Sequence, residues 1–201
     1  FPALLKREPE LVGLNVTVPY KEVVMPYLDA LDESAARIGA VNTIKISGCR
    51  LRGYNTDFIG FRDTLQRFYP VDVQNKALVL GTGGAAKAVW AALDSLGIAY
   101  TSVSRNPSAN ELPYAAITPE VLQSYSLIIN TTPLGMAPDT EHAPAIPYDA
   151  LTPGHFLSDL VYNPEETLFL QKGRAAGAKT MNGMPMLYAQ AEAAWEIWCN
   201  E

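Results

Sequence analysis

The chain contains few of the residues that build disulfide or zinc sites, and it has no excess of positive charge. Its 201 residues include two cysteines, Cys49 and Cys199, which form no Cys-x-x-Cys motif, and only two histidines. A secreted disulfide framework or a zinc site needs more such residues, so we interpret both cysteines as reduced thiols in a cytoplasmic protein. The net charge of -6 argues against nucleic acid as a partner.

Long apolar runs are missing as well. No run approaches the ~18 residues that mark a membrane-spanning helix, and the N-terminal sequence is not that of a signal peptide. His142 lies beside Asp139 and Glu141 in a proline-rich stretch, which is more typical of a solvated loop than of a metal site. With 48% hydrophobic and 18% charged residues, the chain can build a core. We therefore expect a folded protein with no membrane partner and no metal.

The segment over residues 78–105 has the pattern of a dinucleotide-binding unit. An apolar run of strand length leads into Gly81-Thr82-Gly83-Gly84-Ala85-Ala86, which fits the Gly-x-Gly-x-x-Ala fingerprint. The following helix starts with free N–H groups that can face phosphates. The next strand, expected over 98–103, is followed by Arg105 and not by the acidic residue of NAD-binding chains. An arginine accommodates a 2′-phosphate, so the pattern favours NADP.

Regular patterns extend over most of the chain. From residue 76 strands alternate with helices, which predicts a parallel sheet. Later strands are expected over 127–130, 156–161 and 179–181, a surface loop over 137–153, and a last helix over 184–199 after a hinge at Gly183. Earlier in the chain the sequence predicts a helix over 1–7, a strand over 11–18, a helix from Pro19 to Pro26, a helix over 32–38, a hairpin over 41–54, and a helix capped by Thr56 or Asp57.

Together these elements predict an α/β protein of two domains. A Rossmann-type NADP-binding domain over residues 74–181 is inserted into an α/β catalytic domain, which comprises residues 1–73 and a C-terminal helix over 182–201. In such sheets ligands bind beyond the carboxyl ends of the strands. We therefore expect the reaction site in the cleft between the two domains.

Three polar clusters of the first domain, at 15–21, 41–43 and 53–57, are candidates for the chemistry. Lys21 would lie in the first turn of the helix expected from Pro19, where the helix dipole opposes its charge. Asp57 would supply a carboxylate at a strand-to-helix junction. Each residue alone is more typical of a solvated surface lysine or a helix cap. A Lys–Asp pair beside a nicotinamide, however, can exchange a proton with a hydroxyl or ketone, which predicts an NADP-dependent oxidoreductase of a small polar substrate.

At these clusters the chain resembles shikimate dehydrogenase, the enzyme that reduces 3-dehydroshikimate to shikimate with NADPH in aromatic amino-acid (chorismate) biosynthesis. The resemblance runs from about Leu11 to the C-terminus. It is carried by NVTVPYKE at 15–22, GAVNT at 39–43, GYNTD at 53–57, GTGGA at 81–85, NTTPLGM at 130–136, DLVY at 159–162 and NGMPMLYAQ at 182–190.

The resemblance implies a role for individual residues. Lys21 would be the catalytic acid/base, paired with Asp57. Substrate binding is implied for Thr17, Asn42, Asp57, Tyr162 and Gln190. The pyrophosphate of the cofactor would be bound by Gly81, Thr82, Gly83, Gly84 and Ala85, and its 2′-phosphate by Ser104, Arg105 and Asn106, where the family usually has Asn-Arg-Thr. Contact with the nicotinamide is implied for Thr131, Leu160 and Gly183.

The beginning of the chain departs from the family pattern. Family chains begin with a strand-helix-strand unit whose Ser-x-Ser motif binds the substrate carboxylate, and this sequence lacks it. We therefore expect these 201 residues alone to bind NADPH but to reduce dehydroshikimate poorly.

Two alternatives remain beside this interpretation, and the oligomeric state is open between monomer and homodimer. A quinate/shikimate dehydrogenase with broader cofactor use is disfavoured by Arg105, which has no acidic neighbour. A non-catalytic NADP-binding homologue is disfavoured because Lys21, Asp57 and Gln190 occur together.

Overall fold

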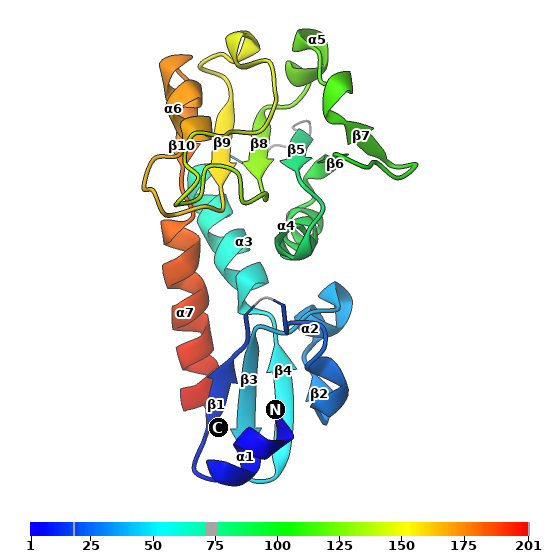
Figure 1. Cartoon of the computed structure of the whole chain (residues 1–201), viewed down its shortest axis with the longest axis vertical. Coiled ribbons are helices and arrows are strands. Elements are labelled where there is room, and N and C mark those ends of the chain that lie inside the picture. Colours follow the sequence, from blue (N-terminus) through cyan, green and yellow to red (C-terminus); the bar gives the residue numbers. More distant parts are fainter. Residues whose placement is uncertain (18, 71–75, 201) are drawn as a thin grey trace.

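The protein is described by a computed structural model that covers residues 1–17, 19–70 and 76–200. It is an α/β structure with two sheets, one of four strands and one of six. Figure 1 shows the two sheets at opposite ends of an elongated molecule, with helices α3 (Thr56–Phe68) and α7 (Met184–Cys199) running between them.

The smaller sheet is built by the first part of the chain, and its strand order is β1-β3-β4-β2. Strands β3 (Thr43–Ser47) and β4 (Arg50–Tyr54) form the expected antiparallel hairpin, whose turn contains Gly48 at φ 61. The other elements are α1 (Pro2–Arg7), β1 (Gly13–Asn15), the 3-10 helix η1 (Met25–Tyr27), β2 (Ala30–Leu31) and α2 (Glu33–Ile38). The helices expected over 1–7 and 32–38 are thus confirmed.

Three local expectations for this region were wrong. The strand expected over 11–18 is limited to β1, and Val18 lies outside the described residues. No helix begins at Pro19; turns lead instead into η1, because a segment this short between two prolines does not repay the cost of helix nucleation. The N-cap of α3 is Asn55, whose side-chain oxygen accepts the Phe58 N–H at 3.1 Å, and not Thr56 or Asp57.

The larger sheet is parallel throughout, with the order β10-β9-β8-β5-β6-β7. Strand β5 pairs with β6 on one side and with β8 on the other, so the strand order reverses there and a ligand crevice forms at the carboxyl ends. The bounds are β5 (Lys76–Leu80), α4 (Gly84–Ser95), β6 (Ala99–Ser104), β8 (Leu127–Asn130), β9 (Phe156–Asp159) and β10 (Lys179–Met181).

Several short elements of this sheet and its faces have no counterpart among the sequence predictions. Strand β9 also stops at Asp159, two residues before its predicted end, which leaves Leu160 and Val161 in the loop beyond the sheet. The unpredicted elements are β7 (Glu111–Pro113), η2 (Tyr114–Ala116), α5 (Pro119–Leu122), η3 (Tyr148–Ala150) and α6 (Leu168–Ala175).

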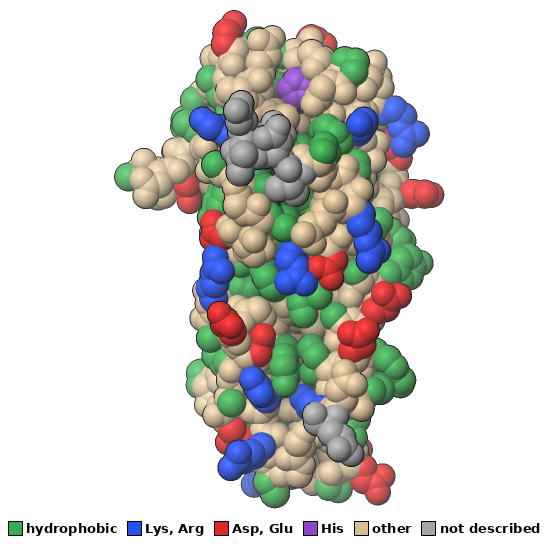
Figure 2. Space-filling model, turned by 180° about the vertical axis from the view of Figure 1, so that it is seen from behind, with side chains coloured by type: hydrophobic (Ala, Val, Ile, Leu, Met, Phe, Trp, Pro, Cys, Tyr) green, Lys and Arg blue, Asp and Glu red, His purple; other side chains and the backbone are tan. Residues whose placement is uncertain are grey.

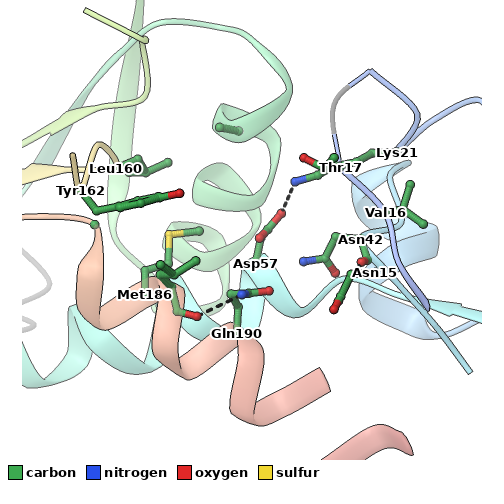
Figure 3. Close-up of a pocket in the computed structure, with 13 residues that line it drawn as sticks. Asn15, Val16, Thr17, Lys21, Asn42, Asp57, Leu160, Tyr162, Met186 and Gln190 are labelled. Atoms are coloured by element: carbon green, nitrogen blue, oxygen red, sulfur yellow. Dashed lines mark hydrogen bonds and ion pairs between the residues drawn. The ribbon is translucent and has the colours of Figure 1, made fainter. Parts of the chain in front are cut away.

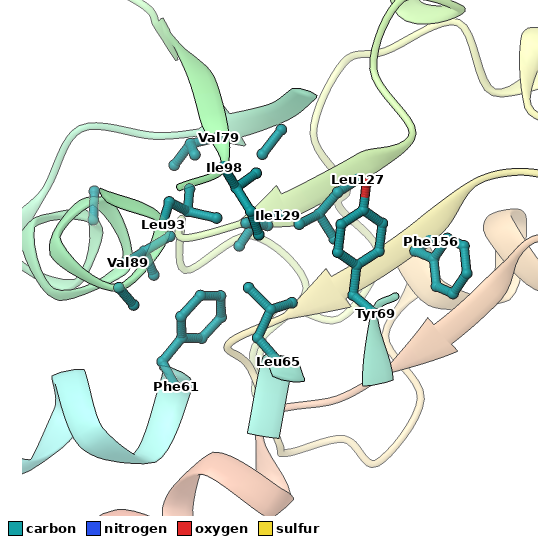
Figure 4. Packing of buried hydrophobic residues seen from close by; sticks show 13 residues of the cluster. Phe61, Leu65, Tyr69, Val79, Val89, Leu93, Ile98, Leu127, Ile129 and Phe156 are labelled. Atoms are coloured by element: carbon teal, nitrogen blue, oxygen red, sulfur yellow. The ribbon is translucent and has the colours of Figure 1, made fainter. Parts of the chain in front are cut away.

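Helix α3 packs against one face of the larger sheet although it follows the hairpin of the smaller sheet. Its side chains Phe61, Leu65 and Tyr69, the last just beyond its end, are at most 1% exposed. They contact Val79 and Ile129 of the sheet in one continuous cluster (Figure 4). Burial of apolar surface therefore fixes the middle and the end of α3 against the larger sheet.

The predicted division at 73/74 and 181/182 is not settled by this architecture. The first boundary falls among residues 71–75, outside the described residues. The N-terminal unit is the part built around the smaller sheet, and the second unit is the part built around the larger sheet. Helices α3 and α7 both run alongside parts of each unit (Figure 1). The domain bounds therefore stay a prediction.

In the described part of the chain, no helix has the length and apolar character needed to cross a membrane.

Helix α7 packs directly against α3 and the smaller sheet at positions where glycines stand. A Cβ at Gly60 of α3 would lie 2.8 Å from the Met186 carbonyl oxygen and 2.9 Å from the Gln190 nitrogen. Near the other end of α7, the Trp198 indole N–H donates to the Ile44 carbonyl at 3.0 Å. The indole lies against Gly13, where a side chain would overlap it. The position of α7 thus depends on the absence of side chains at these glycines.

We predict that Gly60→Ala destabilises the protein by about 1–3 kcal/mol, because the added methyl group overlaps the backbone of α7. This loss should outweigh the gain in helix propensity that alanine normally brings. Urea unfolding measures the change. Gly154→Ala is the control, since its Cβ would meet only the Thr152 hydroxyl at 3.5 Å. A Gly60→Ala protein as stable as the parent would contradict the close packing of α3 and α7.

Candidate functional site

A cavity of about 480 Å³ opens where the two units meet. Figure 3 shows Leu160 and Tyr162 on one side of it and Lys21 with Thr17 on the other. The cavity therefore takes its walls from β1 and the segments near it, from the loop after β9, and from helices α3, α4 and α7. Its lining comprises Asn15, Val16, Thr17, Lys21, Asn42, Asp57, Ala85, Leu160, Tyr162, Gly183, Met186, Leu187 and Gln190.

Lys21 and Asp57 form an ion pair inside this cavity. The Lys21 Nζ lies 2.7 Å from Asp57 Oδ2, and the two side chains are 25% and 20% exposed. Asp57 sits in the first turn of α3, where the helix dipole favours a negative charge. The helix dipole expected to act on Lys21 is absent, because no helix begins at Pro19. The contact that holds the ammonium is the Asp57 carboxylate.

Asn42 lines the cavity and also joins the start of β3 to the start of α3. Its side-chain oxygen accepts the Thr56 N–H at 2.7 Å, and its amide donates to the Thr56 hydroxyl at 3.0 Å. The residue is only 4% exposed. Asn15 in turn donates to the Asn42 carbonyl at 3.3 Å. This network fixes the first turn of α3 and thereby the position of the Asp57 carboxylate.

The other residues expected to bind substrate also line the cavity. The Gln190 amide donates to the Leu187 carbonyl at 3.0 Å, and its oxygen accepts the Thr56 hydroxyl at 3.4 Å. Tyr162 is 44% exposed, and Thr17 is exposed at the rim. The structure thus brings together Thr17, Lys21, Asn42, Asp57, Tyr162 and Gln190 around one space.

A second cavity, of about 790 Å³, lies at the carboxyl ends of β5, β6 and β8. Most of the residues expected to bind the cofactor phosphates line it, together with Thr131. Its lining comprises Gly81, Thr82, Gly83, Val103, Ser104, Arg105, Asn106, Tyr114, Thr131, Thr132, Pro133, Leu134, Ala143 and Ala145.

The residues of the second cavity fit a phosphorylated dinucleotide. Gly81 has φ 102, a left-handed conformation that favours glycine, and a Cβ there would lie 2.8 Å from the Thr131 hydroxyl. Gly83 and Gly84 face open space, since a Cβ at either would have no neighbour within 4 Å. No side chain of the described residues caps α4, which leaves its first N–H groups for a phosphate.

Arg105 supplies positive charge to this cavity. It is exposed just beyond the end of β6. Burial raises the pKa of the Tyr114 hydroxyl, and the positive charge of Arg105 partly opposes that rise. The Ser104 hydroxyl lies 3.4 Å from that of Thr82 and accepts the Asn106 N–H at 3.3 Å. These polar groups frame a position suited to a 2′-phosphate.

The N-terminus of α4 contributes to both cavities. Gly81 and Gly83 line the second cavity, whereas Ala85, at the first turn of the helix, lines the first. Leu160 and Gly183, expected beside the nicotinamide, line the first cavity, and Thr131 lines the second. A Cβ at Gly183 would lie 2.1 Å from the Leu160 carbonyl oxygen, so this glycine is needed for close approach. Residues expected to bind the cofactor therefore line both cavities.

A buried carboxylate, Asp159, connects the walls of the two cavities. It accepts hydrogen bonds from the Thr167 hydroxyl at 2.6 Å, the Asn130 amide at 2.9 Å and the Val161 N–H at 3.0 Å. The Asn130 oxygen accepts the Thr132 N–H and hydroxyl. Burial raises the pKa of Asp159 to about 6, although these hydrogen bonds oppose the rise. The loops after β8 and β9 are thus held by one side chain.

Several lining residues had no assigned role in the sequence predictions. Asn15 and Val16 belong to the candidate polar cluster at 15–21, but no substrate or cofactor contact was assigned to them. Met186 and Leu187 belong to a motif that carries the family resemblance, so their position in it was an available signal. Ala143 and Ala145 come from the proline-rich loop and carry no signal of their own. His142 lies 2.6 Å from Asp139 on the surface. Among the described residues, no group of three or more His, Cys, Asp or Glu side chains could hold a metal ion.

We predict that the free energy of unfolding of the parent exceeds that of Asp159→Asn by a margin that shrinks by about 2 kcal/mol as the pH rises from 4 to 7. The Asp159 pKa rises from 3.8 to about 6 on folding, so the folded state binds its proton more tightly. That contribution is complete below pH 4 and is lost as the pH passes 6. Asparagine does not titrate, but its amide faces donors, which lowers stability at every pH.

Urea unfolding of both proteins at several pH values measures this gap, and circular dichroism establishes that the variant is folded. A gap that stays constant between pH 4 and pH 7 would contradict a raised pKa for Asp159.

Comparisons with known proteins agree with this geometry. The family model described as the shikimate dehydrogenase substrate binding domain matches residues 3–44. Shikimate dehydrogenase (NADP(+)) of Halothermothrix orenii is 39% identical over 206 residues, which cover 92% of this chain and 71% of that protein.

Solved structures are similar over almost the whole chain. Shikimate 5-dehydrogenase (AroE) of Thermus thermophilus, in complex with NADP(H) and shikimate, has a TM-score of 0.87 and 33% identity, and covers 100% of this chain and 78% of its own. Quinate dehydrogenase of Corynebacterium glutamicum, in complex with NAD, has a TM-score of 0.88 and 29% identity, with 99% and 77% covered.

Proposed function

The chain belongs to the shikimate dehydrogenase family, and from this premise we propose that it catalyses the reversible, NADPH-dependent reduction of 3-dehydroshikimate to shikimate in aromatic amino-acid biosynthesis. The observation that carries the proposal is the Lys21–Asp57 ion pair, which lies in one cavity. The N-terminus of α4 contributes to this cavity and to a second one, which is lined by the dinucleotide fingerprint. A proton-transferring group and a cofactor site are both needed for this reaction.

We propose that Lys21 is the acid/base. During reduction the Lys21 ammonium donates a proton to the carbonyl oxygen as that oxygen gains negative charge, and the neutral amine takes the proton back during oxidation. Asp57 holds the amine in place and stabilises its charged form through the 2.7 Å contact. The nicotinamide, when bound, supplies or accepts the hydride.

The remaining lining residues would bind the two ligands. Thr17, Asn42, Tyr162 and Gln190 offer hydroxyl and amide groups to the hydroxyls and carboxylate of the substrate, and their place in the lining supports this role. The cofactor would be held by Gly81, Thr82, Gly83, Gly84 and Ala85 at its pyrophosphate, by Ser104, Arg105 and Asn106 at its 2′-phosphate, and by Thr131, Leu160 and Gly183 near its nicotinamide.

One observation favours a second candidate, a quinate/shikimate dehydrogenase that also accepts NAD. Arg105 is the single Lys or Arg among the described residues that line the cofactor cavity. One cation gives weaker discrimination between NADP and NAD than several would. A non-catalytic nucleotide-binding role is disfavoured, because a module that only binds nucleotide has no need of a Lys–Asp pair inside a neighbouring cavity.

We also propose that the protein acts in the cytosol, as a monomer or homodimer, on a small molecule and not on nucleic acid. Cys49 and Cys199 are free and exposed, which suits a reducing compartment. The net charge is -6, and Figure 2 shows basic and acidic side chains interspersed over the face that it presents. Such a surface offers little to a polyanion.

A spectrophotometric assay at 340 nm tests the reaction, the substrate and the cofactor together. The assay uses the natural protein in the form that its cell produces. We predict that this protein oxidises shikimate faster than quinate and prefers NADP+ to NAD+. Equal rates with both cofactors would support the second candidate. Absence of turnover with either substrate and either cofactor would contradict the proposed function.

We predict that Lys21→Ala lowers kcat by roughly 10²-fold or more, the usual scale for a proton-transfer group. Binding of NADPH, measured by its fluorescence, should survive because Lys21 lies outside the lining of the second cavity. Lys6→Ala, on the exposed surface of α1, is the matched control. An unchanged kcat in the Lys21 variant would remove this residue from its role.

A further inference from the structure

The segment that carries Lys21 has little regular structure to fix it. Residues 19–24 form turns between β1 and η1. Among the described residues, the Lys21 carbonyl accepts the Val41 N–H at 2.8 Å from the segment just before β3, and the Val24 side chain is buried. The orientation of this turn toward the larger sheet must come from side-chain contacts.

Helix α4 presents one face to this side of the molecule. Lys87, Ala91 and Asp94 are spaced i, i+4 and i+7, so they lie on one stripe of the helix. In the middle of the stripe Ala91 is 6% exposed and packs with Ile38 and Ala40 from the end of α2 and the residues after it. Figure 1 shows α4 above α2. The stripe is therefore a contact between the two units.

Each end of this stripe makes an ion pair with the N-terminal unit. Lys87 Nζ lies 2.6 Å from Glu22 Oε1, and Asp94 Oδ2 lies 3.2 Å from an Arg37 nitrogen. The two pairs differ in what they adjoin. Glu22 follows Lys21 directly in the chain, whereas Arg37 lies on α2 and lines neither cavity described above.

Lys87 is also close to the cofactor side of the site. It lies one turn into α4, two residues after Ala85, which lines the reaction cavity. The Glu22–Lys87 contact therefore joins the turn that bears the Lys21 amine to the helix whose N-terminus faces the nucleotide cavity. Any separation of the two units at this point lengthens the contact and moves Lys21 away from α4.

We propose that Glu22 and Lys87 are a positioning pair, which holds the Lys21 turn against α4 so that the Lys21 amine faces the reaction cavity at a fixed distance from the bound cofactor. This inference rests on the proposed function. It assigns no chemical step to either residue, since both act through Lys21.

Because both side chains of the pair are partly exposed, a positioning role can be distinguished from a contribution to folding stability. The Glu22 and Lys87 side chains are 58% and 34% exposed, and ion pairs at such positions contribute little to folding. Removing the pair should therefore leave unfolding by urea almost unchanged. Removing the pair should also lower the fraction of molecules in which Lys21 is held against α4. The expected decrease is about two- to fivefold, which is the range that the energy of an exposed ion pair can produce.

A charge exchange tests the pair. Glu22→Gln and Lys87→Gln each remove the attraction, whereas the double variant Glu22→Lys, Lys87→Glu restores it with the signs reversed. Arg37→Gln is the matched control, because it removes the ion pair at the other end of the same stripe. Three quantities are measured in each protein: kcat/KM for shikimate, the dissociation constant for NADP+, and the hydrogen-exchange rates of the amides in residues 20–24.

The expected result is a two- to fivefold loss of kcat/KM and faster exchange in 20–24 for both single variants, with NADP+ affinity unchanged. The exchanged double variant should recover both quantities to within about twofold of the parent, and Arg37→Gln should resemble the parent in all three.

Other results would overturn the proposal. If Lys87→Gln weakens NADP+ binding while Glu22→Gln does not, and the double variant stays impaired, then Lys87 acts on the cofactor directly. If all variants match the parent, the pair positions nothing. Failure of the proposed function would look different: the parent itself would not turn over shikimate, and the exchange rates of residues 20–24 would still report whether the pair holds the turn.

Discussion

The ion pair between Lys21 and Asp57 is the contact on which the reaction cavity depends. Lys21 comes from a turn without helix or strand, so its own segment does not determine where the amine lies. Asp57 is held far more firmly, because Asn55 caps α3 and the Asn42 side chain bonds to Thr56 beside it. The position of the Asp57 carboxylate is therefore fixed, and its 2.7 Å contact with the Lys21 amine fixes the position of the amine.

The position of the Asp57 carboxylate is fixed because helices α3 and α7 contact both halves of the molecule. The apolar face of α3 is buried against the larger sheet, while its first turn meets the smaller one. Glycines at 60 and 183 bring α7 close to α3 and to the loop after β9. A reaction cavity at the junction therefore depends on packing at a distance from it, and Asp159 adds a polar link between the loops beyond β8 and β9.

Sequence patterns were most informative where local chemistry determines structure. The turn at Gly81, the hairpin at Gly48 and the buried strands of the larger sheet follow from glycine conformations and apolar runs. The helix expected at Pro19 was wrong, because a segment this short between two prolines does not repay the cost of helix nucleation. The convergence of Lys21 and Asp57 was expected from the pattern of polar clusters, but the Glu22–Lys87 contact could not be, since it depends on how two units pack.

Protection of Lys21 from an amine-reactive label tests the central claim most directly. Shikimate and NADPH together form a combination that cannot react, and peptide mass spectrometry reports the labelling of each lysine. The account predicts that this combination strongly slows the labelling of Lys21 and leaves the exposed Lys6 on α1 unaffected. Equal labelling of Lys21 with and without the two ligands would contradict it, because the amine would then lie outside the space that they occupy.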